Sequence, residues 1–358
     1  METISTLYIP VNRAYHSRIS EVDWDNLDFG KYTTDHMLIC DYADHGWQAP
    51  QIIPFGNFSL SPTTLALHYG QTIFEGLKAF RMEDGSINIF RPQKNYDRML
   101  LSAERLCMPM VSMELFLEGL RRLVELEKDW VPGQKDSSLY LRPFIIATET
   151  KLRVKVSDNY RFAIVASPTG AYYQQPVRVK VETDFVRAAH GGTGYAKCGG
   201  NYGASFYPAQ RAKEQGYDQV LWTDGRENKY IEESGTMNVF FLLGDQLVTP
   251  PLSDSILDGV TRDSLIALAD REGIKVAERP VSVEELEHAL ESKTLHEAFG
   301  AGTAAVISPI SVIGIRGKDY MLPGEGLRPG IGSRLKEVLE KIRCGREADV
   351  FSWNFIVK

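Results

Sequence analysis

The sequence is poor in cysteine, has no excess of basic residues, and contains no long apolar run. Its four cysteines, Cys40, Cys107, Cys198 and Cys344, are scattered and form no Cys-x-x-Cys pair, so neither a disulfide framework nor a zinc site is expected. Reduced thiols fit a cytoplasmic protein. The formal net charge of −7 argues against binding to a nucleic-acid backbone, which requires a basic surface.

Membrane and targeting signals are also lacking. No stretch is long and apolar enough to cross a bilayer. The start of the chain carries acidic residues and no apolar core of a leader peptide. We therefore expect a cytoplasmic protein that acts on small molecules and has no metal site, nucleic-acid partner or membrane partner.

The chain of 358 residues is long enough for two domains, and its 43% hydrophobic and 24% charged residues are ordinary for a globular protein. The best linker is the stretch 168–176, which has a proline at each end and a glycine inside. The interpretation is an N-terminal domain over 1–167 and a C-terminal domain over 177–358. Strand and helix patterns are mixed in both.

A glycine-rich stretch surrounds Lys197. Gly191, Gly192 and Gly194 precede the lysine, and the pair Gly199-Gly200 follows it. Neither phosphate-loop pattern fits, because Ala196 and Cys198 flank the lysine and no glycine closes the dinucleotide fingerprint. Two interpretations remain: a solvated surface lysine, or a lysine that forms a Schiff base with a carbonyl cofactor.

Four charged or phenolic side chains suggest a site but have ordinary alternatives. Arg98 lies next to the apolar stripe of a predicted helix, beside Met99, so it either extends to solvent or turns inward toward an anion. Tyr140 and Arg142 share one face of a predicted strand, either as a carboxylate clamp or as a solvated pair. Glu232 and Glu233 are neighbours on a strand, so we expect one to be solvated and the other to face inward toward a cation.

Two small-residue turns could bind an anion through backbone N–H groups. Gly259 and Thr261 stand where a helix begins, although an ordinary threonine N-cap explains the threonine equally well. The turn at Gly302-Thr303-Ala304 follows a predicted strand.

Taken together, these segments resemble the branched-chain amino-acid aminotransferases, pyridoxal-phosphate enzymes of fold type IV. The resemblance covers nearly the whole chain. Its motifs are His68-Tyr69-Gly70 to Phe74-Glu75-Gly76, Tyr140-Leu141-Arg142-Pro143, Lys197 with Gly199-Gly200-Asn201-Tyr202, Glu233 with Gly235-Thr236-Met237-Asn238, Gly259-Val260-Thr261-Arg262, and Gly302-Thr303-Ala304. It implies a mixed α+β and α/β fold with a smaller N-terminal α/β domain and a larger C-terminal domain built on a β-barrel-like sheet core with helices.

The resemblance also assigns cofactor roles. Lys197 would hold pyridoxal 5'-phosphate as an aldimine and later move the proton. Tyr202 would hydrogen-bond the phenolic oxygen of the cofactor, and Glu233 would pair with its ring nitrogen. The phosphate would be held by a group of basic, hydroxyl and backbone donors, namely Arg98, Val260, Thr261 and Thr303, with Thr236 as a weaker candidate.

Substrate roles follow from the same resemblance. Tyr140 with the amides of Thr303 and Ala304 would take the α-carboxylate, and Arg142 would meet the distal carboxylate of glutamate. The apolar side-chain pocket would be lined by Tyr69 and Phe74, for which a core position is the alternative interpretation. Leu152 and Val154 would reach over from a neighbouring subunit, so a homodimer is expected.

The implied reaction is ping-pong transamination of L-leucine, L-isoleucine and L-valine with 2-oxoglutarate. The alternatives are a D-amino-acid aminotransferase or an aminodeoxychorismate lyase of the same fold, or a non-catalytic protein that binds pyridoxal phosphate. One departure concerns a Cys-x-x-Cys redox switch of some family members. Ala305 and Ser308 stand at the aligned positions, so regulation of that kind is not expected.

Overall fold

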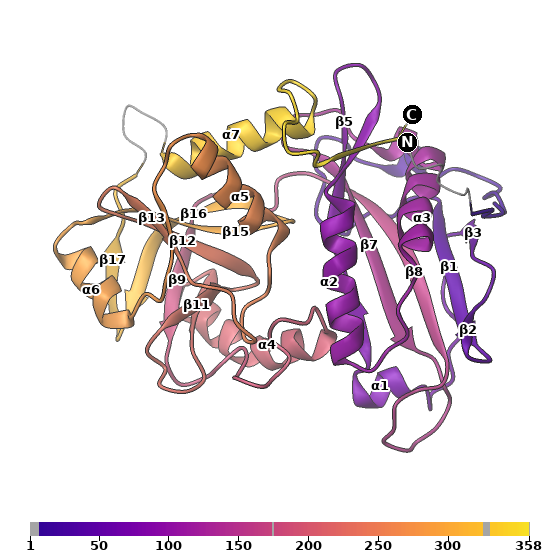
Figure 1. Ribbon diagram of the computed structural model, residues 1–358, viewed down its shortest axis with the longest axis horizontal. Helices are drawn as coiled ribbons and strands as arrows, with labels where there is room; N and C mark the ends of the chain where they lie inside the picture. The colour runs from indigo at the N-terminus through magenta and orange to yellow at the C-terminus, as the bar shows by residue number, and fades with distance from the viewer. Residues whose placement is uncertain (1–6, 174, 325–329, 358) are drawn as a thin grey trace. The chain divides into compact units, whose positions relative to one another are not determined.

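The protein is described by a computed structural model that covers residues 7–173, 175–324 and 330–357 (Figure 1). The chain divides into two compact units. The first contains Met1–Tyr172, Ala196–Gly199 and Ile342–Lys358, and the second contains Tyr173–Tyr195 and Gly200–Lys341.

This division differs from the sequence-based one in two respects. The expected linker 168–176 overlaps the last residues of a strand, Tyr160–Thr169. In addition, segments 196–199 and 342–358 lie in the first unit, which is therefore the longer of the two. The reason is strand addition: the C-terminal strand Asn354–Val357 pairs with Ile87–Phe90, far away in the sequence.

The first unit is built on one nine-stranded sheet with the order β18-β6-β5-β7-β8-β1-β2, to which β3 adds on β1 and β4 on β7. Its pairings are antiparallel. The elements are β1 (His36–Ala43), β2 (Gly46–Trp47), β3 (Gln51–Pro54), α1 (Leu65–Tyr69), β4 (Thr72–Phe74), β5 (Leu77–Arg81), β6 (Ile87–Phe90), α2 (Pro92–Arg105), α3 (Met113–Leu126), β7 (Ser138–Ala147), β8 (Tyr160–Thr169) and β18 (Asn354–Val357), with short 3₁₀ turns at Ile19–Glu21 and Lys128–Trp130.

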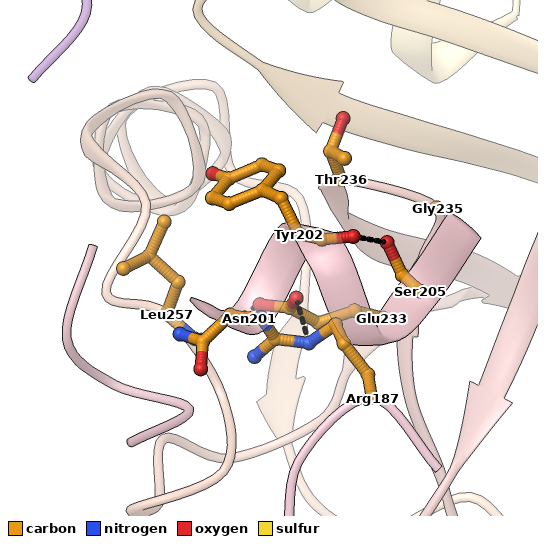
Figure 2. Close-up of a pocket in the computed structure, with 8 residues that line it drawn as sticks. All are labelled: Arg187, Asn201, Tyr202, Ser205, Glu233, Gly235, Thr236 and Leu257. Atoms are coloured by element: carbon orange, nitrogen blue, oxygen red, sulfur yellow. Dashed lines mark hydrogen bonds and ion pairs between the residues drawn. The ribbon is translucent and has the colours of Figure 1, made fainter. Parts of the chain in front are cut away.

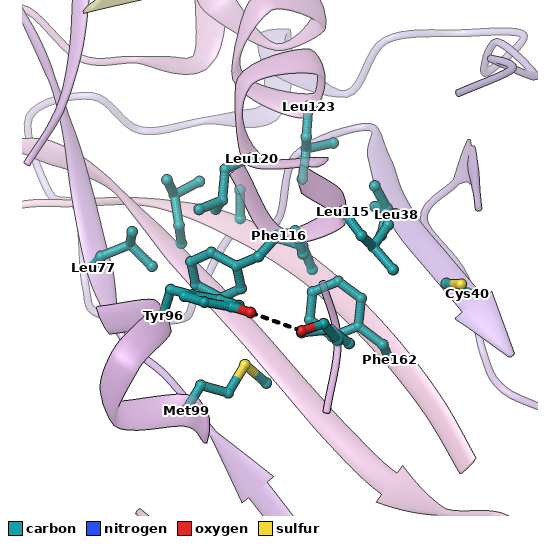
Figure 3. Packing of buried hydrophobic residues seen from close by; sticks show 14 of the residues in the cluster. Leu38, Cys40, Leu77, Tyr96, Met99, Leu115, Phe116, Leu120, Leu123 and Phe162 are labelled. Atoms are coloured by element: carbon teal, nitrogen blue, oxygen red, sulfur yellow. Dashed lines mark hydrogen bonds between the residues drawn. The ribbon is translucent and has the colours of Figure 1, made fainter. Parts of the chain in front are cut away.

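Helices α2 and α3 pack on this sheet and close its core. Ser112 caps α3, because its hydroxyl accepts a hydrogen bond from the Leu115 N–H at 3.1 Å. Pro92 opens α2, a position where a missing N–H is harmless. Figure 3 shows Phe116 close to Tyr96 and Phe162, and its ring centre lies 5.5 Å and 6.4 Å from theirs. The Tyr96 hydroxyl donates to the Val111 carbonyl at 3.1 Å.

The second unit is organised around a closed barrel. Strands β11-β10-β9-β16-β15-β12 are neighbours in that order, and β11 pairs with β12 to close the ring. The expected barrel-like core of the C-terminal half is thereby confirmed. The elements are β9 (Val177–Glu182), α4 (Gly199–Glu214), β10 (Gln219–Thr223), β11 (Ile231–Ser234), β12 (Met237–Leu243), β13 (Gln246–Thr249), α5 (Val260–Arg271), β14 (Val276–Glu278), α6 (Val283–Glu291), β15 (Leu295–Gly302), β16 (Val306–Ile315), β17 (Lys318–Met321) and α7 (Ile331–Arg343).

Short-range signals also hold in this unit. Ser282 caps α6 by accepting the Glu285 N–H at 3.0 Å, as its capping-box spacing predicts. Helix α4 begins at Gly199, directly after the segment that holds Lys197. Among the helices that the structure describes, none is long and apolar enough to span a bilayer.

Candidate active site

Lys197 is fixed through its backbone in the first unit. Its carbonyl accepts the Phe74 N–H at 3.0 Å, and its own N–H donates to the Ser102 hydroxyl at 2.9 Å. Cys198 forms a bridge to Ile73 of β4. The Nζ atom lies 4.8 Å from the centre of the Phe74 ring. The side chain is half-buried, so the interpretation as a freely solvated surface lysine fails.

Tyr140 and Arg142 share one face of β7, and Arg142 contacts both Tyr140 and Phe74. Arg142 donates to the Tyr140 hydroxyl at 3.0 Å, and its guanidinium lies 4.6 Å from the Phe74 ring centre. Gly76 is required here, because a Cβ at this position would lie 2.1 Å from the Tyr140 hydroxyl oxygen. Tyr140 is buried, so the alternative of a solvated edge pair is wrong for it. The arrangement offers a phenol and a guanidinium side by side to a carboxylate.

Phe29 was missed by the sequence analysis. Its ring packs edge-on against Tyr140 at 4.7 Å and against Tyr172 at 5.4 Å. The segment before β1 is irregular, so no periodicity marks Phe29. Its neighbour Leu27 is held by a backbone hydrogen bond from Gly170 at 3.1 Å. Phe29 therefore contacts the Tyr140 ring, and Tyr172 contacts Phe29 in turn.

Arg98 is 4% exposed, which excludes the solvent-extended interpretation. Its guanidinium binds the Glu75 carboxylate at both ends, with Nε to Oε1 at 2.8 Å and Nη2 to Oε2 at 2.7 Å. Glu75 also accepts from the Asn95 side chain at 2.8 Å. Arginine has five N–H donors, so this pairing is compatible with a further bond to a phosphate oxygen.

The remaining expected substrate residues of the first unit lie at its surface. Tyr69 ends α1 and is 39% exposed, so the core interpretation is wrong for it, whereas Phe74 is half-buried. Leu152 and Val154 are 67% and 78% exposed. Apolar side chains with this exposure are not part of the hydrophobic core of their own unit.

In the second unit, Glu233 is buried, as the sequence predicts, and lines a pocket (Figure 2). Its cationic partner is Arg187, whose Nε lies 2.8 Å from Glu233 Oε2. The other oxygen accepts the Leu257 N–H at 2.9 Å. The pocket is lined by Arg187, Asn201, Tyr202, Ser205, Glu233, Gly235, Thr236 and Leu257.

Glu232 corrects one expectation. It is 7% exposed rather than solvated, because β11 is covered on both sides in the barrel. Its carboxylate accepts from the Ser255 hydroxyl. Burial raises the pKa of Glu232, partly offset by the Ser255 hydrogen bond and by the charge of Arg187. Both neighbouring glutamates are thus buried side chains.

The start of α5 is an N-terminus without a side-chain cap. Gly259 is its N-cap residue, and Thr261 lies inside the helix and is 3% exposed, so the threonine N-cap alternative is wrong. A Cβ at Gly259 would lie 1.9 Å from Asn238 Oδ1. Asn238 in turn pairs with Glu233 across β11 and β12 and donates to the Leu257 carbonyl at 2.9 Å. The start of α5 therefore lies close to Asn238, the strand neighbour of Glu233.

The turn with Thr303 and Ala304 connects β15 and β16 beside the same strands. Ala301 pairs with Asn238, so β15 lies next to β12 at this end of the barrel. Thr303 and Ala304 are half-buried. Thr236 follows Gly235 in the turn from β11 to β12 and lines the pocket, where it is exposed. Gly235 has φ of +59°, which favours glycine in this turn.

The residues of the second unit fit the expected cofactor. A buried carboxylate lines the pocket and suits a heterocyclic nitrogen that carries a proton. Tyr202 lines the same pocket, and the N-terminal end of a helix such as α5 is where backbone N–H groups suit a phosphate. In the described part of the chain, no group of three or more His, Cys, Asp or Glu side chains could hold a metal ion.

Three comparisons with known proteins agree with this geometry. The family described as amino-transferase class IV matches residues 72–313. The curated branched-chain-amino-acid aminotransferase 2 of Bacillus subtilis (strain 168) is 47% identical over 335 residues, which cover 92% of this chain and 92% of that protein.

Solved structures of branched-chain aminotransferases have a similar fold. The branched-chain aminotransferase from Thermoproteus uzoniensis with norvaline has a TM-score of 0.74 and 27% identity, and the match covers 90% of this chain and 100% of that one. The branched-chain amino acid aminotransferase of Escherichia coli has a TM-score of 0.73 and 26% identity, and the match covers 90% of this chain and 99% of that one.

Proposed function

From the premise that the chain belongs to the amino-transferase class IV family, we propose that it is a pyridoxal-phosphate-dependent branched-chain-amino-acid aminotransferase. It transfers the amino group of L-leucine, L-isoleucine or L-valine to 2-oxoglutarate. The observation that carries this proposal is the buried carboxylate of Glu233 in a pocket that Tyr202 and Thr236 also line. The curated relative of Bacillus subtilis is named for the same activity, which favours it over D-amino-acid transfer, over the lyase and over binding without catalysis.

Pyridoxal phosphate, when bound, supplies a ring that takes up the electrons released as the substrate α-C–H bond breaks. Lys197 would hold the cofactor, and its Nζ atom would carry the proton that leaves the α-carbon. Glu233 would accept a hydrogen bond from the protonated ring nitrogen, and Tyr202 would donate to the phenolic oxygen. The phosphate would lie among donors from Arg98, Val260, Thr261 and Thr303, with Thr236 nearby.

The substrate would be held by its carboxylate and its side chain separately. Tyr140, with the amides of Thr303 and Ala304, would take the α-carboxylate. Phe74 and Tyr69 would pack against an aliphatic side chain, and Phe29 would extend that wall, since its ring packs 4.7 Å from Tyr140. Arg142 would meet the second carboxylate of glutamate or 2-oxoglutarate.

We further propose that the enzyme works as a homodimer in the cytoplasm. Support comes from Leu152 and Val154, whose side chains are 67% and 78% exposed. Exposed apolar residues in one loop favour contact with another surface. A second copy would then complete the apolar side of the substrate pocket.

The first test is the visible absorption spectrum of the purified protein. We expect a yellow protein whose band bleaches when L-leucine is added without an oxo acid and returns with 2-oxoglutarate. D-Alanine should leave the spectrum unchanged. Bleaching by D-alanine but not by L-leucine would favour the rival aminotransferase. A protein that stays colourless after incubation with pyridoxal phosphate would contradict the proposed function.

A further inference from the structure

Two buried glutamates, Glu232 and Glu233, are neighbours on β11, and Arg187 is the arginine whose charge acts on both. Glu232 is 7% exposed and Glu233 is 3% exposed. Successive residues of a strand point to opposite faces, so each carboxylate has its own surroundings. Arg187 makes the ion pair with Glu233, whereas Glu232 bonds to the Ser255 hydroxyl.

The guanidinium of Arg187 binds two backbone carbonyl groups in addition to Glu233. Its Nη2 donates to the Ser255 carbonyl at 2.5 Å and to the Gly194 carbonyl at 3.1 Å. Its Nε lies 2.8 Å from Glu233 Oε2, and its side chain is 10% exposed. Figure 2 shows the guanidinium and the Glu233 carboxylate together in the pocket that Tyr202 lines. The charge of Arg187 is therefore fixed in place beside one carboxylate oxygen.

A buried carboxylate without a cation tends to take up a proton, because burial disfavours the charged form. Burial has this effect on Glu232, whose pKa is raised. Glu233 is at least as deeply buried but has Arg187 and the Leu257 N–H, at 2.9 Å, to stabilise its charge. A protonated Glu233 would donate a hydrogen bond to a ring nitrogen instead of accepting one.

We propose that Arg187 is a positioning residue that keeps Glu233 ionised and aimed into the pocket, so that Glu233 acts on the cofactor's ring nitrogen only as an acceptor. The identity of the cofactor rests on the proposed function above, whereas the action of Arg187 on Glu233 does not. Arg187 itself need not touch the cofactor. Its contribution to Glu233 is the positive charge of the guanidinium. This is distinct from the two hydrogen bonds that the guanidinium donates to the Gly194 and Ser255 carbonyls.

Three substitutions separate charge from scaffolding. Arg187→Gln removes the charge and leaves a hydrogen-bond donor. Arg187→Lys keeps the charge but cannot bind Glu233 and two carbonyls with one planar fork. Arg279→Gln is the matched control, since Arg279 makes an exposed pair with Glu285 at 2.7 Å in the same unit.

The first readout needs no cofactor. Infrared difference spectra between each protein and its Glu233→Gln derivative isolate the carboxyl bands of Glu233. We expect an ionised carboxylate at neutral pH in the wild type, in Arg187→Lys and in Arg279→Gln, and a protonated carboxyl group in Arg187→Gln. An ionised Glu233 in Arg187→Gln would overturn the proposal. Should Arg187→Gln not fold, a protonated Glu233 in Arg187→Lys would overturn it, and an ionised one would support it.

The second readout uses pyridoxal phosphate labelled with ¹⁵N in the ring. The bound wild type should show the chemical shift of a protonated ring nitrogen, and Arg187→Gln the shift of an unprotonated one, with cofactor affinity weakened about tenfold, the equivalent of one pKa unit. An unchanged ¹⁵N shift in Arg187→Gln would overturn the proposal. A wild type that takes up no cofactor would overturn the proposed function instead, and the infrared result would still decide the role of Arg187.

Discussion

Each unit of the molecule contains a buried arginine–glutamate pair, and the two pairs are built in opposite ways. In the first unit Glu75 is fully buried and binds both ends of the Arg98 guanidinium, at 2.8 and 2.7 Å. In the second unit Arg187 is anchored by two backbone carbonyls and meets Glu233 with its Nε alone. The supporting partner is the glutamate in the first unit and the arginine in the second.

The difference teaches how a buried charge becomes available to a ligand. Glu75 accepts from Arg98, from Asn95 and from the Gly76 N–H, so its oxygens are occupied by the protein. Glu233 lines a pocket although it is buried. Removing the charge of Glu75 should therefore damage folding, whereas removing the charge of Glu233 should damage ligand binding.

The largest effect is expected for Glu75→Gln. One carboxamide oxygen cannot replace two carboxylate oxygens, and Arg98 would stay buried without a compensating charge. Breaking such a pair costs about 3–5 kcal/mol. We expect a loss of this size in the free energy of unfolding, measured by urea denaturation and followed by circular dichroism.

The matched control is the double variant Glu75→Leu/Arg98→Met. It removes both charges, and apolar side chains of similar size are expected to restore most of the stability. It should still bind pyridoxal phosphate more weakly than the wild type, since Arg98 is proposed to hold the phosphate. A double variant with unchanged cofactor affinity would assign Arg98 to folding alone.

The next effect concerns Arg142, which lies on the Phe74 ring and donates to Tyr140. If it receives the distal carboxylate, Arg142→Leu should slow the half-reaction with L-glutamate about 10- to 100-fold, corresponding to about 1.5–3 kcal/mol for a charged hydrogen bond. The half-reaction with L-leucine should change little. Single-turnover absorbance measurements compare the two, and equal losses with both substrates would contradict the assigned role.

Ser102 offers a smaller test within the first unit. Its hydroxyl accepts the Lys197 N–H at 2.9 Å and donates to the Arg98 carbonyl at 2.9 Å, so it joins the backbones of the two residues. Ser102→Ala should lower the free energy of unfolding by about 0.5–1.5 kcal/mol, the net contribution of a typical hydrogen bond. It should also slow cofactor incorporation. The stability of Ser102→Cys should lie between those of the wild type and Ser102→Ala, because the thiol has a similar shape and is a weak acceptor. A Ser102→Cys variant less stable than Ser102→Ala would indicate that packing, not hydrogen bonding, determines the effect.

Sequence reasoning identified one member of each ion pair but not the residue that pairs with it. Arg98 and Glu233 were assigned by the resemblance, and the need of one of the two neighbouring glutamates for a cation was inferred from burial. Arg187 was not identified, because it follows β9 and no spacing relates it to β11. Glu75 was seen only as part of a motif. Ion pairs formed across the fold leave no periodic signal in one chain, whereas caps such as Ser112 and Ser282 do.

The sequence likewise predicted only part of the fold. The mixed architecture and the barrel followed from the resemblance, and the strands that carry Tyr140 and Glu233 from local patterns. The path of the chain between the units did not, because 196–199 and 342–358 join the first unit through non-local strand pairs, Ile73 with Cys198 and Asn354 with Phe90. The prediction that one of the two glutamates is solvated was wrong because it also depends on the rest of the fold. Strand alternation predicts a solvated side chain only where one face of the sheet is open to solvent, and Glu232 is buried.

The smallest effect should come from Glu149, a supporting glutamate near the surface. It is 7% exposed and pairs with Lys151 at 2.7 Å and Lys155 at 2.9 Å, and it accepts the Asp158 N–H at 2.8 Å. These bonds fix the loop that carries Leu152 and Val154. Burial raises the pKa of Glu149, but the lysine and backbone hydrogen bonds outweigh it and lower the pKa to about 2.

Because the pKa of Glu149 is depressed on folding, its stabilisation is complete above the unfolded value near 4.5 and is lost as the pH falls toward about 2. We expect Glu149→Gln to cost only about 0.2–1 kcal/mol of stability. Amide hydrogen exchange should nevertheless rise locally across 150–157, and a dimer held by Leu152 and Val154 should dissociate at higher protein concentration than the wild type. Glu291→Gln, at an exposed pair with Lys318, is the control. Faster exchange in 150–157 with an unchanged dimer would place the partner surface elsewhere, because the loop would then be ordered for its own unit alone.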